Sequence, residues 1–188
     1  MSTSAEDLRA IALTEFASAG YLGTSLHRIA EIAGLSKSSV LYHYASKEVL
    51  LGAAIGPAVD RMDEILSALS AEPLAGERRA RFIAEFVDFL LEHRLEVHMF
   101  INQGPSLEDV PVFERANDLV RRLAQYFSTT TTSTEDRMRF GVALGGAAYM
   151  LVASQRFELE PAPLDETRAA LVSIVTELLA PVDVSPRR

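Results

Sequence analysis

Short polar side chains are concentrated in one stretch of the chain, residues 36–43. They are Ser36, Lys37, Ser38, Ser39, Tyr42 and His43. Hydroxyl, ammonium, phenol and imidazole groups form hydrogen bonds with base edges and phosphate oxygens, and short serines do so without filling a DNA groove. These residue types at this spacing therefore predict contact with double-stranded DNA.

Two short helices joined by a tight turn would position this stretch. The first begins at Thr24 or Ser25, either of which can act as its N-cap, and Gly34 ends it. The second begins at Ser36 and reaches about His43. Small and apolar residues would hold the two together: Ile29, Ala30, Ala33 and Leu35. The pattern predicts a helix-turn-helix, which presents the N-terminal part of its second helix to the major groove.

The residues around this unit follow a specific pattern over residues 20–25, 29–30, 33–37 and 42–48. In residue types and spacing they resemble the DNA-binding domain of the TetR family of bacterial transcription regulators. The resemblance covers about residues 8–51. Beyond residue 52 the chain resembles the family only in helix count, helix lengths and total size.

The resemblance implies DNA contact for nine residues. Thr24 would hold a phosphate at the start of the second helix, and Lys47 would contact the DNA backbone from the start of the fourth. The nine are Thr24, Ser25, Ser36, Lys37, Ser38, Ser39, Tyr42, His43 and Lys47. The family usually has a tyrosine where Leu41 stands, so we expect Tyr42 to face the DNA from a neighbouring angle.

Charge is distributed unevenly along the chain, whose net charge is −8. Residues 1–50 carry four basic and five acidic groups, whereas residues 51–188 carry 14 basic and 21 acidic groups. Non-specific DNA affinity depends on the number of phosphates that a protein neutralises. The nearly neutral N-terminal segment therefore predicts DNA recognition through a small number of specific side-chain contacts.

Several other classes of function lack support in the sequence. With no cysteine, the chain has no disulfide, thiolate metal site or cysteine nucleophile. There is no nucleophile elbow or phosphate-binding glycine loop, and His93 and His98 do not align on one helix face. The longest apolar run, residues 140–153, is shorter than the ~20 residues of a membrane span. We expect a cytoplasmic protein without enzyme activity, cofactor, metal or membrane partner.

Hydrophobic residues recur at helical spacing along almost the whole chain, and no period-two alternation is sustained. The sequence predicts an all-α fold of about nine helices. Residues 1–47 would form a three-helix head that contains the helix-turn-helix. Helix four would begin after Ser46 and join the head to a helical ligand-binding and dimerisation body, residues 48–188. Further helices are expected over about residues 74–92, 93–102, 109–128, 134–158 and 164–180.

Gly56 and Pro57 fall inside the fourth predicted helix. Proline removes a backbone hydrogen bond and its ring clashes with the preceding turn, so we expect a kink or break near residues 53–57. Because this helix joins head to body, Gly56 and Pro57 are predicted to act as a hinge.

A single recognition helix reads few base pairs, so DNA binding of this kind implies a homodimer on a palindromic operator. Residues 140–153 are apolar nearly all round and contain several glycines, which allow a partner helix to approach closely. The predicted dimer interface comprises Gly141, Gly145, Ala148, Leu171, Ile174 and Leu178. A helix buried only within its own protomer is the alternative.

The middle helices are expected to form a pocket for a small hydrophobic or amphipathic effector. The candidate lining is Phe86, Phe89, His98, Met99, Asn102, Phe113, Asn117 and Tyr149. An ordinary hydrophobic core is the alternative for the aromatic residues. The sequence thus predicts a ligand-responsive transcriptional regulator, with repression as the expected sign. The alternative is a constitutive or architectural DNA-binding protein without a ligand.

Overall fold

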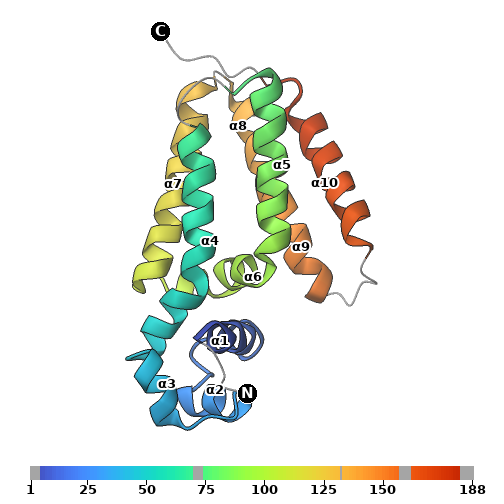
Figure 1. The fold of residues 1–188 in the computed structure, drawn as a ribbon. Helices are drawn as coiled ribbons and strands as arrows, with labels where there is room; N and C mark the ends of the chain where they lie inside the picture. Colours follow the sequence, from blue (N-terminus) through green and yellow to red (C-terminus); the bar gives the residue numbers. More distant parts are fainter. Residues whose placement is uncertain (1–4, 70–73, 132, 157–161, 183–188) are drawn as a thin grey trace.

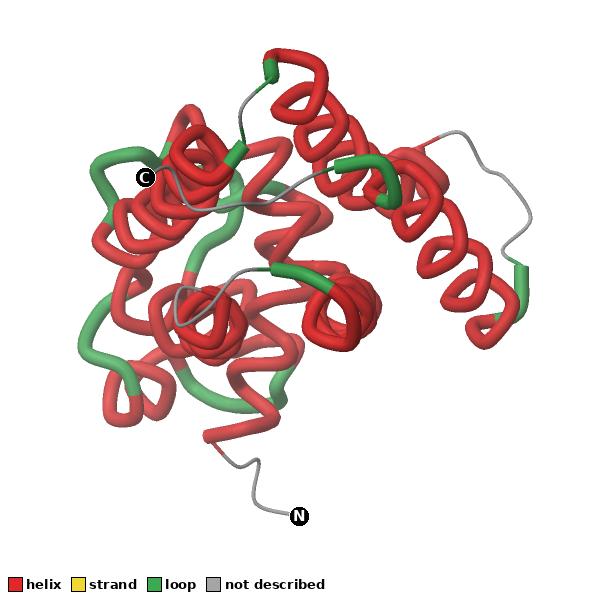
Figure 2. Tube along the Cα trace, turned by 90° about the horizontal axis from the view of Figure 1, so that it is seen from above, coloured by secondary structure: helices red, strands yellow, loops and turns green. Residues whose placement is uncertain are grey.

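The computed structural model describes residues 5–69, 74–131, 133–156 and 162–182, and these residues form helices and short connections (Figure 1). The helices are α1 Ala5–Ala19, α2 Leu26–Ile32, α3 Lys37–His43, α4 Lys47–Leu69, α5 Gly76–Glu92, α6 Arg94–Gln103, α7 Pro111–Thr130, α8 Thr134–Phe140, α9 Gly146–Arg156 and α10 Leu164–Leu179. The described part contains no strand, which Figure 2 shows from above. The predicted all-α fold class is confirmed.

The head is a three-helix unit with its own apolar core. Leu8 and Phe16 of α1 are fully buried, as are Ile29 of α2 and Val40 of α3. Behind α3, the Tyr44 hydroxyl donates a hydrogen bond to the Ala5 carbonyl at 2.8 Å. These contacts fix the orientation of α3 relative to α1.

The turn between α2 and α3 depends on a glycine. Gly34 has a φ of 67°, in the left-handed region that glycine adopts without strain. The Leu35 N–H then donates to the Ala30 carbonyl at 2.8 Å, as in a Schellman motif. Gly34 thereby ends α2 and sets the direction in which α3 leaves.

The body is a bundle of long helices. Figure 1 shows α4 and α7 along one side, α5 in the middle and α10 at the opposite edge, and the packing of α4 on α7 and of α5 on α10 agrees with this view. Ion pairs of Arg115 with Asp60 and of Arg122 with Asp63, both at 2.6 Å, join α7 to α4.

The α6 helix lies across the end of the body that faces the head (Figure 1). The first helix of the head, α1, packs against both α4 and α6. Two body helices therefore hold the head.

The α4 helix continues without a break through Pro57. The expectation of a break is therefore wrong, because the proline ring lies on the solvent side, and the alternative of a kink within a continuous helix stays a prediction. Pro57 is exposed, whereas Ala58 and Val59 are buried. The hydrogen bond that proline cannot donate is lost on the solvent side, where water can satisfy the free carbonyl, while burial of the opposite face stabilises the helix.

The predicted helix over residues 134–158 is one rod in two α-helical parts. A π-helical segment, Gly141–Gly145, joins α8 to α9. Counting this rod once, the described residues form nine α-helices. A π segment adds a residue to one turn and shifts the phase of the helix, so the side chains before and after it face directions that an α-helical wheel does not give.

Arg79 of α5 holds the C-terminal end of α10. Its guanidinium donates to the Leu179 and Val182 carbonyls at 2.7 Å each and to the Leu74 carbonyl at 3.2 Å. The last carbonyls of a helix have no partner within the helix, so these bonds satisfy groups that would otherwise lose water without compensation.

We predict that Arg79→Ala lowers the free energy of unfolding by about 2 kcal/mol, because hydrogen bonds to a charged donor are lost. For a chain of this size the midpoint of thermal unfolding, followed by circular dichroism, would fall by roughly 4–8 °C. Arg81→Ala is the matched control, since Arg81 lies on the same helix and is exposed. Equal shifts for the two variants would contradict this role of Arg79.

Candidate nucleic-acid interface and internal cavity

The start of α3 is organised by two serines. Ser36 is the N-cap, and its Oγ accepts a hydrogen bond from the Ser39 N–H at 3.1 Å. The Ser36 and Ser39 hydroxyls are also 2.8 Å apart. Lys37 and Ser38, between them, are exposed on the outer face of the head. The cap therefore fixes the beginning of the helix and leaves its next two side chains free to reach DNA.

Tyr42 is the most prominent side chain on this face. It is 88% exposed, against 39% for Leu41, and its ring meets that of His43 edge to face at 5.5 Å. Leu41 carries no hydrogen-bonding group, whereas the Tyr42 hydroxyl is available to a phosphate or a base edge. At the position of Leu41, where the related family usually has tyrosine, this chain has no hydroxyl. The aromatic hydroxyl is found one residue later, on Tyr42.

Thr24 differs from its predicted role of phosphate contact. Its side chain is buried, and its hydroxyl donates to the Gly20 carbonyl at 2.9 Å. The neighbouring Ser25 is exposed and caps α2 by accepting from the Arg28 N–H at 3.1 Å. The structure therefore presents Ser25 at the surface and uses Thr24 inside the head.

Lys47 also bonds within the head. Its Nζ donates to the carbonyls of Tyr21 and Thr24 at 2.9 and 3.0 Å and lies 4.2 Å from the centroid of the Tyr21 ring. An ammonium group has three N–H bonds, so at most one remains for a phosphate. Burial raises the pKa of the Tyr21 hydroxyl, and the nearby Glu48 carboxylate raises it further.

The cations of the head differ in their partners. Arg28 lies 3.4 Å from the Glu15 carboxylate and 3.7 Å from that of Glu31, so its charge is largely offset. Lys37 has no carboxylate partner among the described residues. Lys37 is therefore the cation on α3 whose full charge can act on DNA.

Gln103, at the end of α6, connects body and head. Its Oε1 accepts from the Tyr21 N–H at 2.7 Å, and its Nε2 donates to the Phe16 carbonyl at 2.8 Å. Both groups of one side-chain amide are thus bonded to the last turn of α1 and the turn that follows it. The sequence gives no signal for these bonds, because the partners are more than 80 residues away along the chain.

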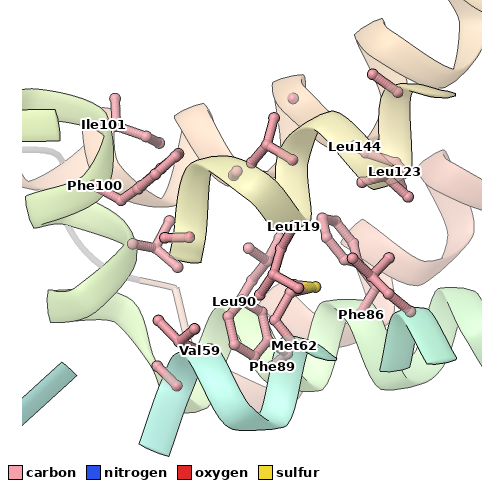
Figure 3. A pocket seen from close by; sticks show the side chains of 18 of the residues that line it. Val59, Met62, Phe86, Phe89, Leu90, Phe100, Ile101, Leu119, Leu123 and Leu144 are labelled. Atoms are coloured by element: carbon pink, nitrogen blue, oxygen red, sulfur yellow. The ribbon is translucent and has the colours of Figure 1, made fainter. Parts of the chain in front are cut away.

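A cavity of about 650 Å³ lies among α4, α5, α6, α7 and the α8–α9 rod (Figure 3), and it is partly open to solvent, since Val120 and Tyr149 of its wall are each about half exposed. Figure 3 shows its wall as carbon side chains, with the sulfur of Met62 as the one exception among those drawn. The three polar or charged side chains in the wall are Glu96, Arg137 and Tyr149. The volume lies within the range of ~300–1,000 Å³ that holds small-molecule ligands.

Four of the eight residues predicted for a pocket line this cavity: Phe86, Phe89, Phe113 and Tyr149. The other four, His98, Met99, Asn102 and Asn117, do not. On α6 the cavity face carries Glu96, Val97, Phe100 and Ile101, whereas His98, Met99 and Asn102 do not line the cavity. Met99 is fully buried in the core, and the Asn102 amide donates to the His98 carbonyl at 3.0 Å on the surface.

The residues predicted for a dimer interface divide between two locations. Gly141, Gly145 and Ala148 line the cavity. On α10, Ile174 is 53% exposed, while Leu171 and Leu178 are half-buried. A side-chain carbon added at Gly141 or Gly145 would meet no atom within 4 Å. Both glycines are also exposed, so the open space beside them reaches the surface, and their place in a dimer interface stays a prediction.

The described residues contain no cluster of three or more metal-ligating side chains. None of the helices they form is both long enough and apolar enough to cross a membrane.

Residues 8–54 match the family of bacterial regulatory proteins named tetR. RutR of Escherichia coli, an HTH-type transcriptional regulator, is 45% identical over 49 residues, which are 26% of this chain and 23% of RutR. YerO of Bacillus subtilis, an uncharacterized HTH-type transcriptional regulator, is 27% identical over 128 residues, which are 66% of this chain and 40% of YerO. The matches thus span less than half the length of these curated relatives.

Similarity to solved structures extends over the whole chain. The ketosteroid transcriptional regulator KstR2 of Mycobacterium tuberculosis has a TM-score of 0.70, with 97% of each chain covered and 19% sequence identity. At this identity the likeness shows a shared fold.

We predict different effects for the two lysines of the head. Lys37→Ala should lower the salt dependence of DNA binding by the equivalent of one phosphate contact, a change of about 1 in the slope of log K against log salt. The free energy of unfolding of this variant should stay within ~0.5 kcal/mol of that of the unchanged protein. Fluorescence anisotropy with a DNA duplex selected from a random pool measures the slope.

Lys47→Ala should instead reduce stability by about 1–3 kcal/mol, because the Tyr21 and Thr24 carbonyls lose their donor. Thermal unfolding of the two variants provides the comparison. A Lys47→Ala protein as stable as the unchanged chain would contradict the internal role of this lysine.

Proposed function

This chain belongs to the TetR family of bacterial transcription regulators, and we propose that it is a ligand-responsive repressor. In this proposal a cytoplasmic homodimer binds a palindromic operator, and a small hydrophobic or amphipathic effector releases it. The observation that carries the proposal is the cavity, because α4 and α6 form part of its wall and also hold the head.

The DNA contacts in this proposal come from the exposed side of α3 and from Ser25. Lys37 and Ser38 would meet phosphates and base edges near the start of the helix, and Tyr42 and His43 would do so one turn later. Lys47 would support this surface by holding the start of α4 against the turn that follows α1. Sequence preference would then depend on few side chains, and dimerisation would supply the second half-site.

The homodimer is supported by apolar side chains that the protomer leaves uncovered. Met138, Val142 and Met150 of the α8–α9 rod and Ile174 of α10 are each more than half exposed. α10 also packs against α8 and the π segment, so the two elements form one surface. Burial of a large apolar side chain is favourable by about 1.5–3 kcal/mol. Burial of this surface against a second copy of the chain would therefore stabilise a dimer.

We predict that Ile174→Asp converts the dimer into a monomer, because a carboxylate would lose its water in an apolar interface. Sedimentation velocity should show half the mass, and affinity for the palindromic operator should fall by at least ~100-fold as the second half-site contact is lost. Ser173→Asp adds the same charge at a neighbouring exposed position and should remain a dimer. Dimers of both variants would show that α10 is not in the interface.

A structural change at the cavity can reach the head through two helices, α6 and α4. Val97, Phe100 and Ile101 of α6 line the cavity, and the same helix ends at Gln103 on the head. Ile55 and Val59 of α4 also line it, on either side of the predicted hinge at Gly56 and Pro57. A ligand that fits better when these helices are displaced would favour a different spacing of the two heads.

We predict that Gln103→Ala uncouples ligand from DNA. The effector is first chosen as the compound that raises the thermal midpoint most in a screen of small hydrophobic molecules. Its affinity for the variant, measured by calorimetry, should change less than about threefold, because Gln103 is not in the cavity wall. Its effect on operator affinity should shrink by at least ~5-fold, since the bonds to Phe16 and Tyr21 are gone.

Asn102→Ala is the matched control, because Asn102 precedes Gln103 and bonds only within α6 among the described residues. It should respond to the effector like the unchanged protein. A full response in Gln103→Ala would exclude this route and leave α4 as the connection.

The proposed function as a whole is tested by selecting duplexes from a random DNA pool and repeating the binding assay with the screened compounds. A palindromic product whose affinity falls with a compound supports the proposal. A palindrome unaffected by any compound that binds would favour a constitutive DNA-binding protein. A selected duplex without two-fold symmetry would contradict DNA binding by a homodimer.

A further inference from the structure

The cavity wall carries two charged side chains, and they lie toward opposite ends of the body. Glu96 belongs to α6, which crosses the end next to the head, whereas Arg137 belongs to α8, at the other end (Figure 1). Between them the wall is formed by apolar side chains such as Phe86, Leu119 and Leu144 (Figure 3). A ligand that fills the cavity therefore meets charge near its ends and hydrocarbon along its length.

The charge at the α6 end already has a partner. The Glu96 carboxylate lies 3.1 Å from Nδ1 of His93, and the exposed fractions of the two side chains are 13% and 19%. This hydrogen bond uses part of the accepting capacity of the carboxylate.

The charge at the α8 end has no carboxylate partner among the described residues. Arg137 donates through Nη2 to the Thr134 hydroxyl at 3.0 Å. Arg139, two residues further along the same helix, instead bonds to the Glu135 carboxylate at 2.7 Å. A guanidinium has five N–H donors and matches a carboxylate in a two-point arrangement. Arg137 therefore offers an anion site at one end of an apolar cavity, while Arg139 does not.

We propose that the effector is an acidic amphiphile, with an apolar body along the cavity and a terminal carboxylate bonded to Arg137. This inference rests on the proposed function, because it assigns the chemical class of the molecule that acts through the cavity. A neutral ligand of the same shape would leave the guanidinium with less water and no new partner, and a cationic one would be repelled by it. The cavity volume of about 650 Å³ accommodates a single hydrocarbon chain or a compact ring system with its acidic group.

Three probes that share one hydrocarbon chain separate the effect of the headgroup from that of the body. They are sodium dodecanoate, dodecan-1-ol and dodecyltrimethylammonium chloride, each used below its micelle concentration. Calorimetric titration of the full chain should give dodecanoate at least ~10-fold higher affinity than the alcohol, as expected for hydrogen bonds to a charged group. The ammonium compound should bind more weakly than either.

Arg137→Gln should abolish this preference by lowering dodecanoate affinity to about that of the alcohol, with alcohol affinity changed less than threefold. Arg139→Gln is the matched control and should keep the full preference for the carboxylate. Ala116→Phe, which fills part of the cavity, should weaken all three probes while its circular dichroism spectrum shows an intact helical fold.

Equal affinities for acid and alcohol, or an acid preference that survives Arg137→Gln, would overturn the assignment of the headgroup. Dodecanoate binding that persists in a folded Ala116→Phe variant would place the probe outside the cavity and overturn it as well. Absence of binding by all three probes would also count against it. None of these results touches the proposed function, which is judged by the response of operator binding to the independently screened compounds.

Discussion

The connection between head and body depends on the side-chain amide of Gln103. One amide both accepts from the Tyr21 N–H and donates to the Phe16 carbonyl, and its removal would leave two partly buried backbone groups without partners. The helix that carries it also forms part of the cavity wall. A displacement of α6 at the cavity would therefore also displace a support of the head. The covalent connection through α4 has the same property, because α4 begins in the head and passes along the cavity.

Most cations of the head considered above are bonded to groups within the head. Arg28 is offset by Glu15 and Glu31, and Lys47 is largely used to hold the start of α4. The DNA contacts that we propose are on the exposed side of α3, where Lys37 and Tyr42 are the longest polar side chains, and at Ser25. Weak bulk attraction makes operator binding sensitive to the placement of these groups, and so to small movements of the head. A head that bound DNA chiefly through bulk charge would respond less to displacement.

Much of this arrangement can be predicted from the sequence, because it depends on local chemistry. Gly34 ends α2 and Ser36 caps α3, as expected. The rest depends on how the helices pack against one another in space. Pro57 does not break α4 because its ring faces solvent, and a π segment interrupts the helix predicted over residues 134–158. The rotation of α6, which decides that Phe100 lines the cavity and Met99 does not, is set by packing against distant helices.

If occupation of the cavity and binding of operator are linked, as proposed above, the linkage is reciprocal. It is tested by the affinity of a cavity-bound compound, measured by calorimetry with and without saturating operator duplex. Operator should lower the affinity for the compound by the same factor, on the order of 10-fold, by which the compound lowers the affinity for operator. An affinity for the compound that is identical with and without operator would contradict it.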